Sequence, residues 1–127
     1  MVATMTDLTR EREDMVERQL KRRGIREAPI LDAFRAVPRE AFVCAEHEHM
    51  AYGDHPLPIE AGQTISQPYI VALMIQAGAI REGDNVLEVG AGSGYAAAVM
   101  SRIASRVVAI ERQHELVEIA RVRMQRL

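Results

Sequence analysis

Two short, mostly apolar runs interrupt the helical spacing of hydrophobic positions along this chain. They lie at residues 85–89 and 106–110, and both are rich in β-branched side chains. Runs of this length and composition predict buried strands. The stretch between them, residues 96–103, has the length of a short helix. A strand, a short crossover helix and a second strand predict a right-handed βαβ unit with parallel strands.

Apolar residues at helical spacing predict further helices on both sides of this unit. The predicted helices cover residues 8–20 with a stop at Gly24, residues 29–38, residues 68–78 and residues 113–127. In the last of these, the apolar positions Leu116, Ile119, Ala120, Met124 and Leu127 share one face. Residues 39–61 contain Pro56 and Pro58 and are predicted to be irregular.

A glycine-rich turn joins the first predicted strand to the following helix. Glycines stand at positions 90, 92 and 94, where they permit a tight turn and a close approach by a ligand. The dinucleotide fingerprint G-x-G-x-x-G would need a glycine or alanine at position 95, where Tyr95 stands instead. The loop therefore favours a nucleotide-type ligand other than a dinucleotide, although a tight turn without any ligand would use the same residues.

Glu111 follows the second predicted strand, 21 positions after Gly90. An acidic residue about 20 positions past such glycines is placed to accept hydrogen bonds from both ribose hydroxyls of a nucleotide. The alternative is a solvated loop residue. Because the glycines, the strand and the acid agree, we interpret the unit as a ligand site.

The composition suits a soluble globular protein. The chain has 127 residues, 48% hydrophobic and 27% charged, with a formal net charge of -2. This charge gives no reason to expect nucleic acid or an anionic membrane as a partner, and no apolar run approaches the roughly 20 residues that span a bilayer. The N-terminus lacks the apolar core of a secretion signal, and the single Cys44 cannot form an internal disulfide. We expect a cytoplasmic protein.

Three histidines gather in the irregular stretch, at positions 47, 49 and 55. Their spacing matches no standard zinc arrangement, so we interpret them as surface residues and predict no metal.

Ser66 stands just before Pro68, the expected first turn of a helix. A serine in this place commonly caps the helix, and the residue types favour that role. Free N–H groups and a hydroxyl at a helix start can also bind a carboxylate. Both interpretations stay open.

Only two convincing strands can be found. Parallel strands need cover on both faces and partners at their edges, and the second strand would keep a bare apolar edge. We therefore expect an incomplete domain.

Several segments resemble the protein-L-isoaspartate O-methyltransferase family, from about residue 14 to residue 127. They are residues 52–59 (YGDHPLPI), 62–72 (GQTISQPYIVA), 86–95 (VLEVGAGSGY) and 108–112 (VAIER), with 39–43 (REAFV) in the leading helices. The glycine loop alone is typical of any class I methyltransferase, whereas the segment around Ser66 makes the match specific.

The resemblance implies an α/β, Rossmann-like class I methyltransferase sheet, of which only the first βαβ unit is present, after N-terminal helices. It implies S-adenosylmethionine as cofactor and a cytosolic repair enzyme that methylates L-isoaspartyl residues in damaged proteins and peptides, a monomer when full length. The implied cofactor-binding residues are Glu88, Gly90, Gly92, Gly94 and Glu111, and the isoaspartyl carboxylate would meet Ser66 as the catalytic residue, with Thr64 and Ile65 beside it.

The expected division places a helical and irregular region at residues 1–61 and the start of the cofactor-binding domain at residues 62–127. The family continues well past the second strand, so we expect this short chain to bind cofactor weakly and to transfer methyl poorly. Two other functions stay open: a nicotinamide-dependent oxidoreductase and a non-catalytic fragment.

Overall fold

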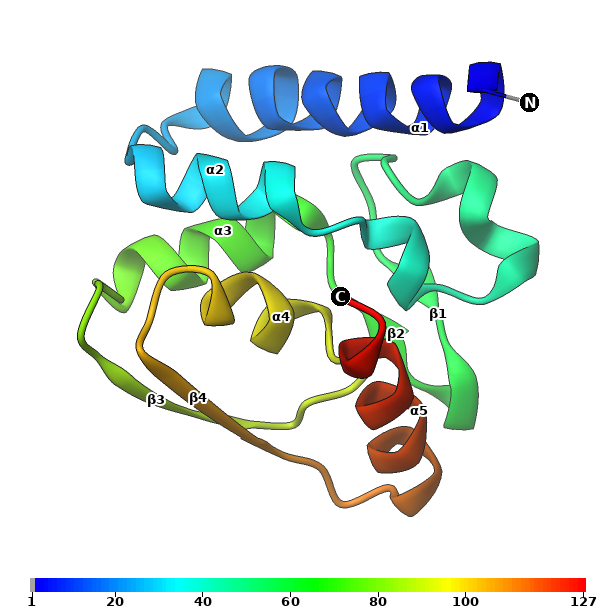
Figure 1. Cartoon of the computed structure of the whole chain (residues 1–127), viewed down its shortest axis with the longest axis vertical. Helices are drawn as coiled ribbons and strands as arrows, with labels where there is room; N and C mark the ends of the chain where they lie inside the picture. Colours follow the sequence, from blue (N-terminus) through cyan, green and yellow to red (C-terminus); the bar gives the residue numbers. More distant parts are fainter. Residues whose placement is uncertain (1) are drawn as a thin grey trace.

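The computed structural model describes the backbone of residues 2–127 and the side chains of residues 7–127. Its regular elements follow one another from an N-terminal helix to a C-terminal one (Figure 1). They are α1 (Val2–Asp14), α2 (Ala28–Ala36), β1 (Leu57–Pro58), β2 (Thr64–Ile65), α3 (Pro68–Ala77), β3 (Asn85–Val89), α4 (Tyr95–Ser101), β4 (Arg106–Ile110) and α5 (His114–Gln125).

The predicted βαβ unit is confirmed. Strands β3 and β4 pair in parallel over their whole length, from Asn85 opposite Arg106 to Val89 opposite Ile110. Helix α4 connects the two strands and lies against one face of the pair, between the sheet and the N-terminal helices (Figure 1). This arrangement brings the carboxyl ends of both strands, and the loops that follow them, to the same edge of the sheet.

The predicted helices are also present, with shifted boundaries. Helix α1 begins before the predicted start and continues through a π-helical segment (Met15–Leu20) and a 3₁₀ turn (Lys21–Arg23) to the expected stop at Gly24. In α5 the prediction for Leu127 was wrong, because the helix ends at Gln125 and Leu127 is exposed. Arg123 is buried on the inner face of α5 instead, beside Leu116 and Ala120.

The prediction that residues 39–61 are irregular was wrong in part. This region contains two 3₁₀ segments (Arg39–Phe42 and Ala45–Met50), and β1 pairs antiparallel with β2. Each strand has two residues, too few for a periodic pattern, and Pro58 occupies one of the four places. A third 3₁₀ turn, Glu60–Gly62, connects the two strands and makes a short hairpin.

One hydrophobic core joins the N-terminal helices to the βαβ unit. The ring of Tyr95, at the start of α4, is fully buried and packs against Phe34 and Phe42, with centroids 6.1 and 5.7 Å away. The buried Arg39 guanidinium lies 5.0 Å from the Tyr95 ring centroid, and its Nε donates a 2.7 Å hydrogen bond to the Ala51 carbonyl. The residue that breaks the dinucleotide fingerprint is therefore a core residue. The division of the chain after residue 61 stays a prediction.

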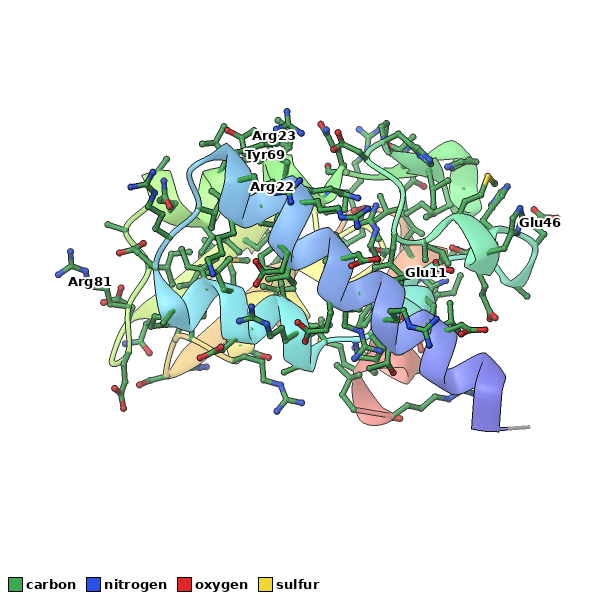
Figure 2. The ribbon with its side chains drawn as sticks, turned by 90° about the horizontal axis from the view of Figure 1, so that it is seen from above. Glu11, Arg22, Arg23, Glu46, Tyr69 and Arg81 are labelled. Carbon is green, nitrogen blue, oxygen red and sulfur yellow. The ribbon has the colours of Figure 1, made fainter. Side chains whose placement is uncertain are left out.

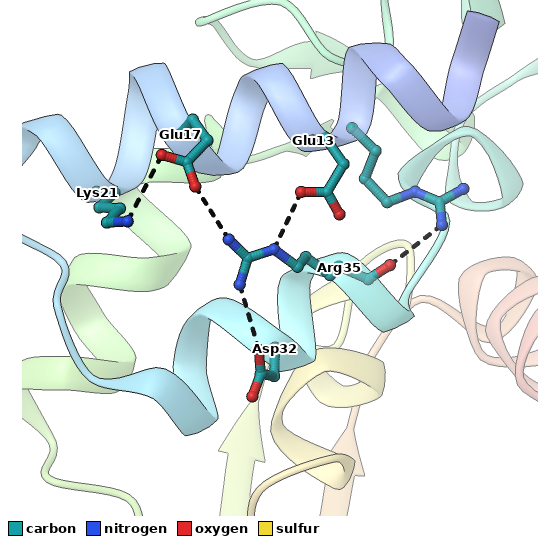
Figure 3. A network of polar contacts seen from close by, with 6 residues as sticks. Glu13, Glu17, Lys21, Asp32 and Arg35 are labelled. Atoms are coloured by element: carbon teal, nitrogen blue, oxygen red, sulfur yellow. Dashed lines mark hydrogen bonds and ion pairs between the residues drawn. The ribbon is translucent and has the colours of Figure 1, made fainter. Parts of the chain in front are cut away.

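On the solvent side, charged side chains connect α2 to α1 and to the π-helical segment that continues it. Arg35 donates to Glu13 at 3.1 Å and to Glu17 and Asp32 at 3.2 Å, and Lys21 lies 3.7 Å from Glu17 (Figure 3). Exposed pairs of this kind contribute about 0–1 kcal/mol each, so burial of apolar side chains is the main force that holds these helices together.

The other face of the β3–β4 pair is open to solvent. No helix covers it in the described part of the chain (Figure 1). Its side chains are Leu87, Val89, Val108 and Ile110, of which Leu87 is 64% and Val89 76% exposed. The expectation that the two strands lack cover is confirmed. Besides the edge of β4, one whole face of the β3–β4 pair is uncovered. In residues 2–127, no helix combines the length and apolarity needed to cross a membrane.

Candidate functional site

Two adjoining cavities meet at Gly90, where β3 ends. One, of about 400 Å³, is bounded by Gly90 at the end of β3, by Glu111 after β4, and by Gln63 from the β1–β2 hairpin. The other, of about 410 Å³, lies between β3 and α3 and includes Ser66 and Glu88. Gly90 lines both cavities, so the glycine loop is their common wall. Ligands of open α/β sheets bind at this edge, beyond the carboxyl ends of the strands.

A larger cavity of about 520 Å³ lies at the opposite end of the strands, beside Glu27, Arg81, Arg102 and Ser105. It holds none of the predicted site residues. Its position at the amino ends of parallel strands is not where such sheets bind ligands.

The three loop glycines do not share one purpose. Gly90 has a φ of 93°, and a Cβ added there would meet no atom within 4 Å, so its outer side is open to a ligand. Gly94 has a φ of 92°, but an added Cβ would lie 3.1 Å from the Ala120 Cβ. Only the first two glycines, Gly90 and Gly92, face open space. Gly94 permits the close packing of α5.

Most amides of the loop already donate hydrogen bonds within the chain. Gly90 and Ala91 donate to the Ile110 carbonyl at 2.8 and 3.0 Å. Gly94 donates to the Ala91 carbonyl at 2.9 Å, and Tyr95 donates to the Ser93 hydroxyl at 3.2 Å. A pyrophosphate cradle depends on free N–H groups at the helix start, and these donors are committed elsewhere.

Glu111 lies beside the glycine loop, as predicted. One carboxylate oxygen accepts a 2.8 Å bond from the Gln113 amide, and the other accepts a 3.3 Å bond from the Gly92 amide. These backbone donors, Gln113 first, hold the pKa of the carboxyl below its ordinary value. The group therefore stays ionised at neutral pH. A carboxylate has about four lone-pair sites, so two remain for additional donors such as hydroxyl groups.

Glu88 carries a half-buried carboxyl group in β3. Burial raises its pKa to about 7. Its Oε1 atom is buried and has no hydrogen-bond partner. A buried acceptor without a donor costs about 1–3 kcal/mol. A cation or N–H donor entering the cavity beside Ser66 would remove that cost, so Glu88 fits a ligand that carries an ammonium group.

Ser66 does not cap α3, so the favoured capping role was wrong. The N-cap residue is Gln67, and no side chain makes a capping hydrogen bond at this helix start. Ser66 is exposed to the cavity that also contains Glu88. Pro68 at the first turn removes one of the orphan N–H groups, which lowers the need for a cap. The hydroxyl is therefore left for a ligand.

Strand pairing and side-chain hydrogen bonds hold the segment that carries Ser66. Ile65 is buried opposite Leu57 in the hairpin, while Thr64 is exposed. Gln67 donates a 2.7 Å bond to Asp54, which also accepts from Arg23 at 3.1 Å.

The Arg23 guanidinium lies 4.0 Å from the Tyr69 ring centroid, and both residues are seen together where α3 begins (Figure 2). The helix that carries Arg23 thus holds the Ser66 segment from outside.

No group of three or more His, Cys, Asp or Glu side chains among the described residues is gathered to hold a metal. His47 is half-buried, and His49 and His55 are exposed.

Sequence reasoning missed Gln63, which lines one cavity, and the ion pair of Glu60 with Arg123 next to it. Gln63 and Glu60 belong to a hairpin too short to leave a pattern. Arg123 could have been suspected, because it is a charged residue at a core position of α5, seven residues after the buried Leu116.

The chain is similar to one known family over most of its length. The family described as Protein-L-isoaspartate(D-aspartate) O-methyltransferase (PCMT) matches residues 10–127. A protein-L-isoaspartate O-methyltransferase from Methylorubrum extorquens is 64% identical over 118 residues, 93% of this chain and 52% of the relative. One from Koribacter versatilis is 49% identical over 123 residues, 97% of this chain and 55% of the relative. The chain thus spans about half the length of these curated relatives.

Solved structures of such proteins share the fold. One protein-L-isoaspartate O-methyltransferase superimposes with a TM-score of 0.82 at 35% identity, over 91% of this chain and 38% of that chain. A Plasmodium falciparum protein named as a beta-aspartate methyltransferase (PCMT), in complex with S-adenosyl-L-homocysteine, gives a TM-score of 0.76 at 27% identity, over 91% of this chain and 55% of that chain. The predicted Rossmann-like fold and the family resemblance are confirmed.

Proposed function

This chain belongs to the protein-L-isoaspartate O-methyltransferase family, and on that premise we propose that it carries the N-terminal part of the site of an S-adenosylmethionine-dependent carboxyl methyltransferase. The proposed substrate is the carboxylate of L-isoaspartyl residues in damaged proteins and peptides. The proposed setting is the cytoplasm, and the proposed full-length form is a monomer.

One observation carries the proposal. Ser66, from the start of α3, and Glu88, from β3, line the same cavity, and that cavity meets the glycine loop at Gly90. A site for methyl transfer to a carboxylate must hold an anion beside a cationic cofactor. A hydroxyl and an unpartnered buried carboxyl in one cavity suit these two opposite charges.

The residues present fit S-adenosylmethionine in three places. Glu88 would accept from the amino group of the cofactor, because its Oε1 has no other donor. Gly90 and Gly92 would pass beside the methionine part, because nothing occupies the space where their Cβ atoms would be. Glu111 would bind the ribose hydroxyls with the acceptor sites that the backbone leaves free. When bound, this cofactor supplies a methyl group on a sulfonium, which is a good leaving group.

The chain itself then has a positioning task. A carboxylate is already an anion at neutral pH, so no general base is needed to activate it. Rate enhancement comes from holding one oxygen in line with the methyl group, at about 3 Å. We assign this task to the Ser66 hydroxyl, with Thr64 and Ile65 as substrate-binding neighbours. The serine donates one hydrogen bond and forms no covalent bond.

A nicotinamide-dependent oxidoreductase is the second candidate. It would place a pyrophosphate on the amides of the loop. Those amides donate within the chain, and Tyr95 occupies the third position of the fingerprint as a core residue. The loop therefore favours S-adenosylmethionine. A non-catalytic fragment, the third candidate, would keep the same cofactor site and differ in activity.

We predict that the isolated chain binds S-adenosylhomocysteine weakly, with a Kd above about 100 μM, and NAD more weakly still. The reason is the open face of β3 and β4, which leaves one side of the cofactor in water. Titration followed by amide chemical shifts measures both affinities. Glu111→Ala should weaken S-adenosylhomocysteine binding at least about tenfold. Tighter binding of NAD than of S-adenosylhomocysteine would contradict the proposal.

We predict that Ser66→Ala lowers methyl transfer to an isoaspartyl peptide about 10- to 100-fold at limiting substrate. The loss should appear in the single-turnover rate with labelled methyl donor, while cofactor affinity stays within about twofold. Ser101→Ala is the matched control, because the Ser101 hydroxyl bonds to the Ala98 carbonyl inside α4, outside this cavity. An unchanged rate for Ser66→Ala would remove the serine from the mechanism.

A further inference from the structure

Arg123 is a buried arginine that contacts two segments next to the candidate site, the β1–β2 hairpin and the glycine loop. Its Nη2 atom lies 2.9 Å from the Glu60 Oε1 atom, and its Nη1 atom donates a 3.4 Å hydrogen bond to the Ser93 carbonyl. Glu60 begins the turn of the β1–β2 hairpin, and Ser93 is in the glycine loop. A side chain on α5 thereby links Glu60 and Ser93, which lie 33 positions apart in sequence and belong to different segments.

Each of the two linked segments leads to a residue that lines one cavity. The turn Glu60–Gly62 leads directly to Gln63, which lines the 400 Å³ cavity together with Gly90 and Glu111. The turn is also tight, since Ala61 has a φ of 57° and Gln63 donates to the Glu60 carbonyl at 3.3 Å. A turn held in this way transmits the position of Glu60 to Gln63.

Burial distinguishes the Arg123–Glu60 ion pair from the Arg121–Glu118 pair on the same helix. The side chains of Arg123 and Glu60 are 10% and 25% exposed, whereas those of Arg121 and Glu118, 3.0 Å apart on the same helix, are 62% and 51% exposed. Removing one partner of a buried pair leaves an unpaired charge in the interior, which is far more costly than the loss of an exposed pair. The buried pair is therefore able to hold two segments together.

We propose that Arg123 is a positioning residue that holds the β1–β2 hairpin against the glycine loop, so that both walls of the cofactor cavity keep their relative position. The proposal rests on the proposed function in one respect, namely that this cavity receives the cofactor. The linkage itself can be measured without any ligand.

Cys44, the only cysteine of the chain, can report on the pair. Burial raises the pKa of its thiol first, and Glu60 raises it further by its charge and by a hydrogen bond. Arg123 acts in the opposite direction, and Glu46 adds a smaller upward effect. Loss of the Glu60 charge and loss of the Arg123 charge should therefore move the reactivity of Cys44 in opposite directions.

The test compares Arg123→Met and Glu60→Gln with Arg121→Met, the matched control on the exposed side of α5. Amide hydrogen exchange is followed in the hairpin, at Ile59 and Gln63, and in the loop, at Gly94. Arg123→Met should accelerate exchange about tenfold or more in the hairpin, although the hairpin is far from residue 123 in sequence. Glu60→Gln should accelerate exchange at Gly94, and Arg123→Lys should restore part of the hairpin protection.

Alkylation of Cys44 across pH 7–10 adds a readout that general loosening of the fold would not give. Glu60→Gln should shift the alkylation profile to lower pH, and Arg123→Met should shift it to higher pH. Arg121→Met should leave the profile in place. If Arg123→Met unfolds the chain, Glu60→Gln decides alone, because it keeps Arg123 and leaves the helix intact.

Exchange changes confined to α5, or equal to those of Arg121→Met, would overturn the proposal. The ligand arm separates it from the proposed function: Arg123→Met should weaken S-adenosylhomocysteine binding about tenfold relative to Arg121→Met. If neither wild type nor variant binds this ligand, the proposed function fails, while the exchange and alkylation data still decide the role of Arg123.

Discussion

Gly94→Ala is expected to destabilise the chain by about 2–4 kcal/mol. Two effects add at this position. The backbone has a φ of 92°, which costs a residue with a Cβ about 1 kcal/mol. In addition, the new Cβ would lie 3.1 Å from the Ala120 Cβ and 3.3 Å from the Met124 Cε, so α5 must move away. Urea unfolding followed by circular dichroism measures the loss.

Gly83→Ala is the matched control for Gly94→Ala. Gly83 has the same φ of 92°, but an added Cβ meets nothing within 4 Å. Its substitution should cost about 1 kcal/mol, so the difference between the two variants isolates the packing of α5 against the loop. Equal losses at the two positions would show that the contact with Ala120 is unimportant.

Glu88→Gln is expected to stabilise the chain at high pH. The difference in free energy of unfolding between this variant and wild type should be about 1–2 kcal/mol more favourable to the variant at pH 8 than at pH 5. Burial raises the pKa of Glu88 to about 7 from an ordinary value of 4.5. The folded chain therefore binds this proton more tightly than the unfolded chain does. Wild-type stability falls as the pH rises from about 4.5 to about 7, and the loss is complete above that range. Solvent screens the effect to about 1–2 kcal/mol, because the carboxyl group is only partly buried.

Urea unfolding at pH 5, 6, 7 and 8 measures this difference. Glu82→Gln is the control, since Glu82 is exposed and its variant should follow the wild-type curve. Glu88→Gln should also weaken S-adenosylhomocysteine binding above pH 7, because the neutral glutamine has no negative charge to pair with an ammonium group. Parallel stability curves for wild type and Glu88→Gln would show that this carboxyl is not held in a desolvated state.

The βαβ unit could be predicted because its signals are local. A short run of mostly apolar residues specifies each strand, and the glycines fix the turn between β3 and α4. Glu111 could be placed because the ends of parallel strands meet at one edge. The hairpin of β1 and β2 could not be predicted, because its four strand residues carry no periodic pattern and the strands form only through the pairing of Leu57 with Ile65 and of Pro58 with Thr64.

The role of Ser66 depended on tertiary contacts. Its residue type and its place before Pro68 favour a helix cap, whereas the structure makes Gln67 the N-cap residue and leaves the Ser66 hydroxyl facing a cavity. The direction of the entering backbone decides this, and that direction is set by the hairpin and by the bond from Gln67 to Asp54. No pattern within a few residues of Ser66 contains this information.

The sequence by itself determined the family, the parallel pair of strands, the glycine loop and the acid that follows it, since each depends on residue types at short and fixed spacing. Only the tertiary structure decided that Gly94 serves helix packing, that Glu88 has an unpartnered buried oxygen, and that Arg123 bonds to both the hairpin turn and the glycine loop. These properties depend on distances between distant segments, and such distances are set by how the elements pack rather than by local preference.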